Sequence, residues 1–327
     1  MTKLLYLPIE VRLRDIYPKL LIAKKALEHG FDVVIGDRYK IEELSFYAPP
    51  NIFFTRGLEA PVYEKLFPKL KKNRTVIVGQ DVEAGQFLDN PPVYKFIRVR
   101  EDRMKYLSTF FAWGKSEYKY LIDKYSNLNI KILLTGNPIF DIKKYKIETL
   151  QSKSNLKNYY LVNLSWALFR PISKIKENKT VQTFKLNGAT QKDIKSHFDF
   201  GKQRIQENRS LLEAIKNIAY IFDDETFVIR PHPSDNLEVF KKNIKLPKNC
   251  KIIREDSVLN WISNAKKVIH PYCNSSIETL ILGKIPICYD GFKKEKRELL
   301  LRKISNFADN TDTLLKLIKA EESKEMI

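Results

Sequence analysis

The sequence has few of the residues that hold metal ions or form disulfide networks. Only three cysteines and four histidines occur among 327 residues. Cys250, Cys273 and Cys288 are an odd number and lack the close spacing of zinc ligands. We therefore expect reduced thiols, as in a cytoplasmic protein, and no structural zinc site.

Long apolar runs are also missing. No stretch approaches the roughly 20 residues that a membrane-spanning helix needs. The first apolar segment, residues 4–7, ends at Pro8 and is followed by charges, which is typical of a buried strand rather than a signal peptide. These features predict a cytoplasmic protein, and the membrane contact they leave open is peripheral, at the inner face of the cell membrane.

Several catalytic signatures are absent as well. The sequence has no glycine-rich dinucleotide fingerprint, no GxxxxGK[ST] phosphate loop and no GxSxG elbow. These absences argue against nicotinamide-dependent enzymes, P-loop kinases and serine hydrolases. No Asp-x-Asp pair occurs either, so we expect no metal ion and no cofactor in the reaction.

Positive charge, in contrast, is abundant, with a formal net charge of +19. No nucleic-acid-binding motif accompanies it, so a nucleic-acid partner is not expected. The lysines are spread along the chain, which fits either a solvated surface or attraction to an anionic membrane. The best local candidate for touching lipid head groups is residues 293–297, continuing to Arg302 and Lys303.

Strand-like and helix-like segments alternate from the start of the chain. Apolar β-branched runs separated by helices are typical of parallel sheets covered on both faces. Asn137, Pro138 and the charged segment 143–157 interrupt the series, so we place a boundary there. The predicted domains are residues 1–142 and 143–327. Strands are expected at 4–7, 32–35, 52–54, 75–78, 109–113 and 130–134, then at 159–162, 226–230, 250–253, 267–270 and 285–289, with a loop or lid at 167–200.

The fold class that follows is α/β, with two Rossmann-like doubly wound domains facing a cleft. Ligands of such sheets bind beyond the carboxyl ends of the strands, where loops meet helix N-termini. A cleft between two such domains is the default position for a ligand site. The polar residues that follow predicted strands are therefore the candidates for function.

A strand in the second domain runs directly into Arg230, Pro231, His232 and Pro233. The prolines stiffen this segment and stop it from continuing as strand or helix. Arginine can bind phosphate oxygens through two N–H groups, and histidine can donate to them. The alternative is a rigid loop whose histidine caps a neighbouring helix.

The strand predicted at 267–270 ends at His270, and small polar residues then open a helix. Free backbone N–H groups at a helix start attract anions, and the hydroxyls of Ser275 and Ser276 would add donors. The same residues also fit a capping box, with Ser275 as N-cap and Glu278 three residues later. Asn163 and Ser165, after the first strand of this domain, are further candidates, although ordinary capping explains them equally well.

In the first domain, the strand predicted at 75–78 runs into Gly79, Gln80, Asp81, Val82 and Glu83. A carboxylate at this end of a strand can serve as a general base or as a nucleophile at an anomeric carbon. A glycine-rich turn with solvated acids is the alternative. Glu10, Arg12, Arg14 and Asp15, after the first strand, either line the acceptor side or begin a solvated helix.

Five segments occur in an order that resembles the bacterial surface carbohydrate biosynthesis proteins, relatives of the capsule Kdo and nonulosonic acid transferases. The resemblance covers nearly the whole chain and implies the GT-B scaffold of two-domain glycosyltransferases, with CMP-activated donors. The segments are Leu7, Pro8, Ile9, Glu10, Val11 and Arg12; Phe110, Phe111, Ala112, Trp113 and Gly114; Thr135, Gly136, Asn137 and Pro138; Arg230, Pro231, His232 and Pro233; and Ser275, Ser276, Ile277 and Glu278.

The resemblance implies a donor site in the second domain, formed by Arg230, His232, Pro233, His270, Asn274, Ser275, Ser276 and Glu278, to which we add Asn163 and Ser165. It also implies a catalytic carboxylate in the first domain. Relatives tend to carry that carboxylate directly before a glycine, where this chain has Ala84, so Glu83 or Asp81 takes the role.

The expected function is transfer of a sugar, Kdo or another nonulosonic acid, from a CMP-activated donor to a glycan or lipid-linked glycan of the bacterial surface. The leaving nucleotide phosphate would be stabilised by Arg230, His232 and the helix start at Ser275. The alternatives are a UDP-sugar or CDP-polyol donor on the same loops, and a non-catalytic partner in glycan assembly.

Overall fold

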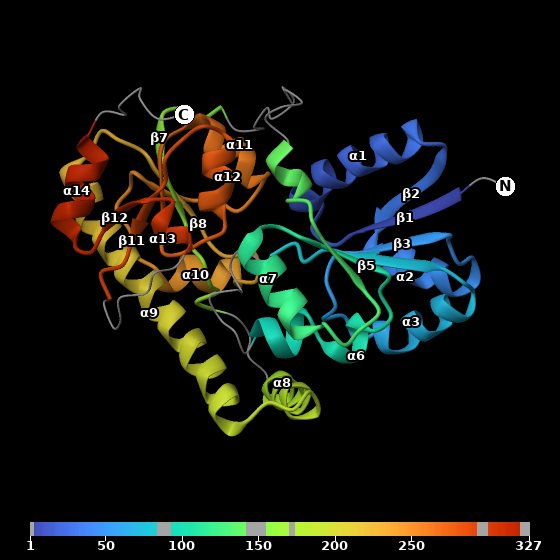
Figure 1. Cartoon of the computed structure of the whole chain (residues 1–327). Helices are drawn as coiled ribbons and strands as arrows, with labels where there is room; N and C mark the ends of the chain where they lie inside the picture. Colours follow the sequence, from blue (N-terminus) through green and yellow to red (C-terminus); the bar gives the residue numbers. More distant parts are fainter. Residues whose placement is uncertain (1–2, 84–92, 142–154, 170–173, 293–299, 321–327) are drawn as a thin grey trace. The chain divides into compact units, whose positions relative to one another are not determined.

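The computed structural model describes residues 3–83, 93–141, 155–169, 174–292 and 300–320 (Figure 1). The chain divides into two compact units, an N-terminal unit of Met1–Lys146 with Lys179–Ile194, and a C-terminal unit of Ile147–Asn178 with Lys195–Ile327. The second segment of the N-terminal unit falls in the range that the sequence assigns to the C-terminal domain.

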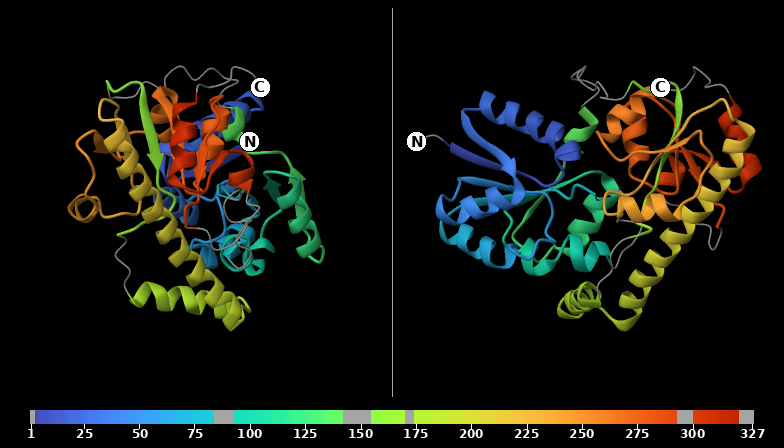
Figure 2. Two further views of the ribbon diagram at one scale, coloured as in Figure 1. Left: turned by 90° about the vertical axis from the view of Figure 1, so that its left-hand side faces the viewer. Right: turned by 180° about the vertical axis from the view of Figure 1, so that it is seen from behind.

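A six-stranded parallel sheet forms the centre of the N-terminal unit, in the order β2-β1-β3-β4-β5-β6 (Figures 1 and 2). All six predicted strands are confirmed: each is a short apolar run, buried at inner positions of the sheet and half-buried in the edge strands β2 and β6. Their bounds are Lys3–Ile9 (β1), Phe31–Asp37 (β2), Ile52–Thr55 (β3), Val76–Gly79 (β4), Thr109–Ala112 (β5) and Lys131–Leu134 (β6).

Helices cover both faces of this sheet. On one face Phe53, Phe67 and Phe110 lie in a large buried cluster, and on the other Leu7 and Phe54 pack with α1. The elements are α1 (Arg12–Glu28), α2 (Arg38–Tyr47), α3 (Tyr63–Lys72), the π-helix η1 (Tyr94–Arg98), α6 (Glu101–Met104), α7 (Lys115–Lys124) and the 3-10 helix η2 (Pro138–Asp141).

The C-terminal unit has a second six-stranded parallel sheet, in the order β12-β11-β10-β7-β8-β9. The five strands predicted from the sequence are present. The sixth, β12, was not predicted from the sequence. The strands are Tyr159–Asn163 (β7), Phe227–Arg230 (β8), Cys250–Ile252 (β9), Ala265–His270 (β10), Ile287–Tyr289 (β11) and Asn306–Ala308 (β12).

The loop or lid predicted at 167–200 is wrong, since most of that range is helical. Helix α8 spans Lys174–Leu186 and α9 spans Gln191–Ile221. The buried face of α9 includes Arg204, Glu207 and Asn208 at helical spacing. The sequence predicts a helix only from 207 to 222, because residues 167–200 are polar and show no apolar periodicity that would mark a helix. The remaining helices are α10 (Leu237–Asn243), α11 (Val258–Asn264), α12 (Ser275–Ile281), α13 (Leu300–Lys303) and α14 (Thr311–Lys319).

Each sheet has one point where the direction of strand addition reverses. In the N-terminal unit, β1 lies between β2 and β3, so consecutive connections leave it on opposite sides. In the C-terminal unit, β7 takes the same position between β8 and β10. Ligands of open parallel sheets bind beyond the carboxyl ends of the strands at such points.

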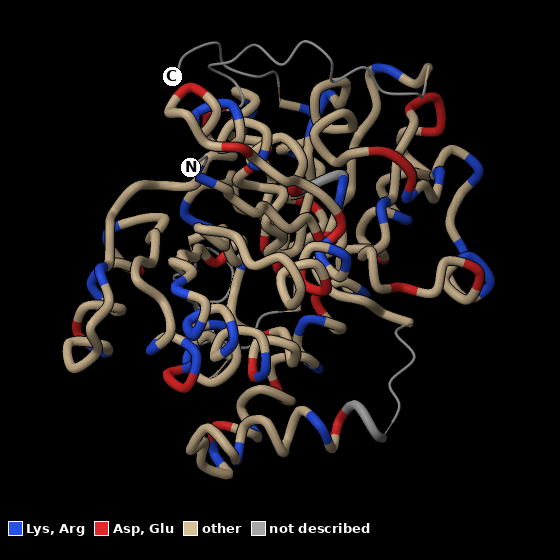
Figure 3. The backbone as a smooth tube through the Cα atoms, turned by 90° about the vertical axis from the view of Figure 1, so that its right-hand side faces the viewer, with Lys and Arg blue, Asp and Glu red and all other residues tan. Residues whose placement is uncertain are grey.

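Lysine and arginine are scattered over many elements in Figure 3. Of the cluster proposed for lipid head groups, only Arg302 and Lys303 fall among the described residues, in α13, and residues 293–299 lie outside them. In the part of the chain that the structure covers, no helix combines the length and apolarity needed to cross a membrane.

A substitution at Gly79, the last residue of β4, tests how tightly the N-terminal sheet is packed. A Cβ placed there would lie 2.8 Å from Thr55 Cγ2 and 3.0 Å from Leu107 Cδ2. We expect Gly79→Ala to lower the free energy of unfolding by about 1–3 kcal/mol through overpacking. Gly114→Ala is the matched control, because its added Cβ meets nothing within 4 Å. Equal midpoints for both variants in urea unfolding would contradict this account.

Candidate functional site

At the reversal point of the C-terminal sheet, side chains from β7 and α12 meet. Asn163, the last residue of β7, donates from Nδ2 to Ser275 Oγ at 3.1 Å, and both residues are buried. The bond joins the carboxyl end of β7 to the loop that follows β10. Asn163 and Ser275, predicted as separate candidates, are thus brought together where a ligand of this sheet is expected.

Ser276 is buried as well, and its hydroxyl donates to the carbonyl of Cys273 at 2.9 Å. The backbone N–H groups of Ser276 and Ile277 donate to the carbonyls of Cys273 and Asn274. The predicted supply of free N–H groups at this helix start is therefore reduced by local turns.

The predicted capping box is wrong. Asn274, not Ser275, occupies the N-cap position, and its side chain makes no capping hydrogen bond. Ser275 is already helical and its hydroxyl accepts from Asn163. The buried Oδ1 of Asn274 has no hydrogen-bond donor among the described residues. A buried carbonyl oxygen without a donor is costly, so this atom is a place where a ligand hydroxyl or N–H would be stabilised.

Arg230 lies at the predicted strand end, but its guanidinium is used within the protein. Nη1 donates to the carbonyl of Glu255 at 2.8 Å, and Nη2 donates to those of Arg254 and Asp256 at 3.2 and 2.9 Å. Its guanidinium carbon lies 5.6 Å from the ring centroid of Trp261. Burial lowers its pKa to about 10. These contacts fix the loop after β9, and they leave fewer donors for a phosphate than the motif suggests.

His232 and Pro233 lie in a tight turn that a buried carboxylate holds. Asp235 accepts from the backbone N–H of His232 at 3.1 Å and from that of Phe169 at 2.8 Å. The ring Nδ1 of His232 accepts from the N–H of Ser234 at 3.1 Å. In the neutral form Nδ1 is therefore unprotonated, and the ring proton is on Nε2. Pro233 is exposed beside it.

His270 is fully buried at the end of β10. Its Nδ1 accepts from the N–H of Cys273 at 3.1 Å, and its Nε2 contacts Ser305 Oγ at 3.1 Å. Burial, reinforced by the charge of Arg204, lowers its pKa to about 3. Both ring nitrogens are occupied by the protein, so His270 shapes the turn after β10 instead of offering a donor to a ligand.

A buried polar cluster on α9 was not among the predicted site residues. Arg204 donates to Glu207 at 2.8 Å, and its guanidinium carbon lies 4.9 Å from the ring centroid of Tyr272. Tyr272 in turn donates to Asp290, at the end of β11, at 2.8 Å. Polar residues at helical spacing within 200–208 are the signal that could have identified this cluster. It also fixes Ser165, whose N–H donates to Asn208 Oδ1 at 3.2 Å.

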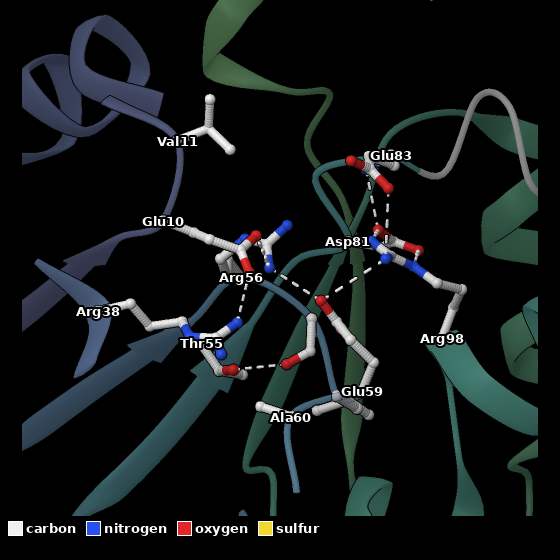
Figure 4. A network of polar contacts seen from close by, with 12 residues as sticks. Glu10, Val11, Arg38, Thr55, Arg56, Glu59, Ala60, Asp81, Glu83 and Arg98 are labelled. Carbon is white, nitrogen blue, oxygen red and sulfur yellow. Dashed lines mark hydrogen bonds and ion pairs between the residues drawn. The ribbon is translucent and has the colours of Figure 1, made fainter. Parts of the chain in front are cut away.

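In the N-terminal unit, Asp81 forms a bidentate ion pair with Arg98 of the π-helix η1. Arg98 Nε donates to Asp81 Oδ2 at 3.0 Å, and Nη2 donates to Oδ1 (Figure 4). Asp81 is fully buried. Burial raises its pKa, and the Arg98 charge opposes that shift. A carboxylate held in this way has little freedom to reach a substrate.

Glu83 is the more accessible of the two predicted catalytic carboxylates. Its side chain is 26% exposed, against 0% for Asp81. Its Oε2 lies 3.4 Å from Arg98 Nη1, and its backbone N–H donates to Asp81 Oδ1 at 2.9 Å. The Asp81–Arg98 pair thus supports the segment that carries Glu83.

A network of ion pairs links these residues to the reversal point of this sheet. Glu10, after β1, accepts from Arg38 at 2.6 Å and pairs with Arg56, which follows β3 (Figure 4). Arg56 also donates to Glu59 at 2.8 Å, and Glu59 lies 3.6 Å from Arg98. The loops after β1, β2, β3 and β4 are therefore joined by charge. Glu10 was expected to line the acceptor side or begin a solvated helix, and it takes neither a helical nor a fully solvated position.

Behind this network lies Glu117, a buried residue of α7. It accepts from the Tyr94 hydroxyl and, at 2.6 Å, from the N–H of Trp113. Burial raises its pKa to about 7. Within the described ranges, no group of three or more His, Cys, Asp or Glu side chains is arranged to hold a metal ion.

No protein-family profile matches the chain, and no curated protein matches it in sequence. Solved structures match its fold over nearly its whole length. The UDP-GlcNAc 2-epimerase of Methanocaldococcus jannaschii, in complex with UDP-GlcNAc and UDP, has a TM-score of 0.60 at 16% identity, covering 98% of this chain and 92% of its own. These values show a shared fold.

Two further structures give the same result. The UDP-GlcNAc 2-epimerase from Neisseria meningitidis has a TM-score of 0.56 at 12% identity, covering 97% of this chain and 90% of its own. The wall teichoic acid polymerase TagF, as a variant soaked with CDPG, has a TM-score of 0.52 at 10% identity, with coverages of 97% and 78%. The chain has the GT-B fold. The prediction of two Rossmann-like domains is confirmed.

Glu117 predicts a measurable pH dependence of stability. The ordinary pKa near 4.5 applies to the unfolded chain, and the folded value is about 7. Folding therefore favours protonated Glu117. The stability that this residue contributes to the folded chain is fully present below about pH 4.5 and is lost as the pH rises to 7. Glu117→Gln stays neutral at all of these pH values. We therefore expect its free energy of unfolding to rise relative to that of the wild type by roughly 2–3 kcal/mol between pH 5 and pH 8.

Urea unfolding at pH 5, 6, 7 and 8 measures this difference. Glu64→Gln, at an exposed position of α3, is the control and should follow the wild type throughout. A constant difference between Glu117→Gln and the wild type at all four pH values would contradict the assignment.

Proposed function

We propose that this chain is a glycosyltransferase that takes its sugar from a pyrimidine-nucleotide donor and passes it to a hydroxyl group of a bacterial surface glycan. The donor binds at the reversal point of the C-terminal sheet. The N-terminal unit supplies the reacting carboxylate. The class of donor includes UDP-sugars and the CMP-activated nonulosonic acids that the sequence resemblance implies. A CDP-linked polyol is an alternative donor, whose transfer would instead form a bond at phosphorus and release CMP.

The observation that carries this proposal is the buried, unpartnered Oδ1 of Asn274. It adjoins Ser275, which the hydrogen bond from Asn163 fixes at the carboxyl ends of β7 and β10. A buried acceptor atom without a donor is satisfied when a ligand hydroxyl or N–H arrives. Nucleotide riboses and sugars supply such groups.

The fold neighbours support a pyrimidine nucleotide in particular. The Methanocaldococcus jannaschii enzyme was solved with UDP-GlcNAc and UDP, and TagF with CDPG. All three ligands are pyrimidine nucleotides, and UDP-GlcNAc and CDPG carry an attached group. We extend this ligand class to the present chain because its fold matches theirs over 97% or more of its length.

The transfer breaks the bond between the anomeric carbon and the donor phosphate oxygen, and the nucleotide leaves with the bonding electrons. The acceptor hydroxyl oxygen forms the new bond and loses its proton. Glu83 either takes that proton as general base or first attacks the anomeric carbon as nucleophile. Its partial exposure favours it over Asp81, which its bidentate pair with Arg98 holds in the interior.

An epimerase is the second candidate, because two of the fold neighbours are UDP-GlcNAc 2-epimerases whose own chains are covered to 90% or more. The two functions differ in their products. A transferase needs an acceptor and releases free nucleotide, whereas an epimerase converts UDP-GlcNAc to an isomer of equal mass without an acceptor.

Donor binding gives the first test. We expect calorimetry to detect binding of at least one of UDP, CDP and CMP, and Asn274→Ala to weaken it about tenfold through loss of a buried hydrogen bond. Asn243→Ala is the matched control, since Asn243 is exposed on α10. Binding that Asn274→Ala leaves unchanged would remove the donor site from this position.

The carboxylate gives the second test. We expect Glu83→Gln to lower sugar transfer by about 10²–10⁴-fold with nucleotide binding unchanged, since the general base or nucleophile is lost. Asp81→Asn should instead lower stability by about 3–5 kcal/mol, because Arg98 loses its buried partner. Mass spectrometry of products from UDP-, CDP- and CMP-activated donors measures transfer. Full transfer by Glu83→Gln would exclude this role, and an isomerised UDP-GlcNAc without acceptor would favour the epimerase.

A further inference from the structure

Lys19 is a buried cation that the proposed mechanism does not use. It lies in the second turn of α1, on the face that packs against the sheet, and is 3% exposed. Its Nζ lies 3.8 Å from the ring centroid of Phe54, near the end of β3. Among the residues that the structure describes, no carboxylate forms an ion pair with it and no acceptor bonds to it.

The surroundings of Lys19 are those of the reversal point between β1 and β3. Asp15, one turn earlier on α1, accepts at Oδ2 from the N–H groups of Glu10 and Val11 at 3.1 and 3.0 Å. Its charge favours the protonated amine, whereas the charge of Arg56 opposes it. Arg56 is itself buried and paired with Glu10. Lys19 therefore lies within electrostatic range of one buried carboxylate, Asp15, and of a second cation, Arg56.

A lysine with only 3% of its surface exposed and no ion pair is rare, because water compensates its charge poorly there, which costs free energy. Cation–π contact with Phe54 offsets only part of that cost. Burial accordingly lowers the pKa of Lys19 to about 7. The neighbouring arginines Arg38, Arg56 and Arg98 all have carboxylate partners, so Lys19 is the exception in this part of the unit.

We propose that Lys19 is the anchor for an oxyanion, a phosphate or carboxylate group of the acceptor, bound at the reversal point of the N-terminal sheet. The anion supplies the direct ion pair that Asp15, which acts on Lys19 only through its charge, does not form, and it offsets the repulsion of Arg56. Describing the ligand as the acceptor rests on the proposed function, but the anion site itself does not. The acceptor class is then an acidic or phosphate-bearing glycan.

Anion binding at this site has a signature that an ordinary surface lysine lacks. At pH 7.5 a lysine with a pKa of about 7 is neutral in about three of four molecules. An anion beside it restores the charge, so binding at pH 7.5 takes up at most about three quarters of a proton. Calorimetry of the full chain with inorganic phosphate and with glucuronate, each in two buffers of different ionisation enthalpy, measures this uptake directly.

We expect the wild type to bind phosphate, glucuronate or both with proton uptake. The probe that binds more tightly identifies the anion as a phosphate or a carboxylate. Lys19→Met, which keeps the packing on Phe54, should weaken that binding at least tenfold and abolish the uptake. Lys24→Met, an exposed position on the same helix, should behave as the wild type. Absence of binding to both probes, or equal binding by Lys19→Met, would overturn the proposal.

Two controls separate this result from misfolding and from failure of the proposed function. Lys19→Met should unfold in urea at a midpoint equal to or above that of the wild type, because it removes a buried charge. It should also bind the donor nucleotide unchanged, because that site lies in the C-terminal unit. Loss of anion binding with intact nucleotide binding supports the Lys19 site whether or not sugar transfer is found.

Discussion

Buried arginines paired with carboxylates hold the loops at the carboxyl ends of the N-terminal sheet. Arg38 and Arg56 both reach Glu10, which follows β1. Arg98 pairs with Asp81 of its own connection and lies 3.6 Å from Glu59, which follows β3. A buried charge is tolerated only when paired, and removing one partner costs far more than the pair contributes. The network therefore couples these loops, and the position of Glu83 depends on an arginine fifteen residues away along the chain.

The C-terminal unit achieves the same end with mostly neutral groups. Asn163 donates to Ser275, and the turn after β10 is closed by His270, whose ring stays uncharged because its pKa is about 3. A nucleotide phosphate brings negative charge of its own, so a wall of fixed dipoles is a suitable environment for it. The two units thus present different surfaces at equivalent points of equivalent sheets: ionic and crowded in one, neutral and hydrogen-bonded in the other.

Features that depend on residues close together in the sequence could be predicted from it, and features that depend on distant residues could not. Strands were predictable, because apolar β-branched runs report burial on both faces directly. Only the later part of helix α9 was predicted, as a helix over 207–222, because residues 191–200 belong to a polar and irregular stretch without apolar periodicity. The motifs were correctly placed at strand ends. Their chemistry was harder to predict, since the sequence does not reveal that the guanidinium of Arg230 turns toward the carbonyls of residues 254–256.

Ion pairs between residues that are distant in sequence explain the rest of what could not be predicted about the site. Asp81 and Glu83 look equivalent in the chain, and only the arrival of Arg98 on a π-helix distinguishes them. A π-helix widens the turn, and such distortions are frequent at functional sites. The carboxylate that receives the bidentate pair becomes structural, and its neighbour keeps an exposed oxygen. Lys19 is the opposite case, a buried cation without a carboxylate in an ion pair. Such a cation is stable when it loses its proton, or when an anion from outside the protein binds beside it. In this unit, therefore, two groups of buried charged residues can be distinguished. Those with a partner build the site, and those without one are available to a ligand.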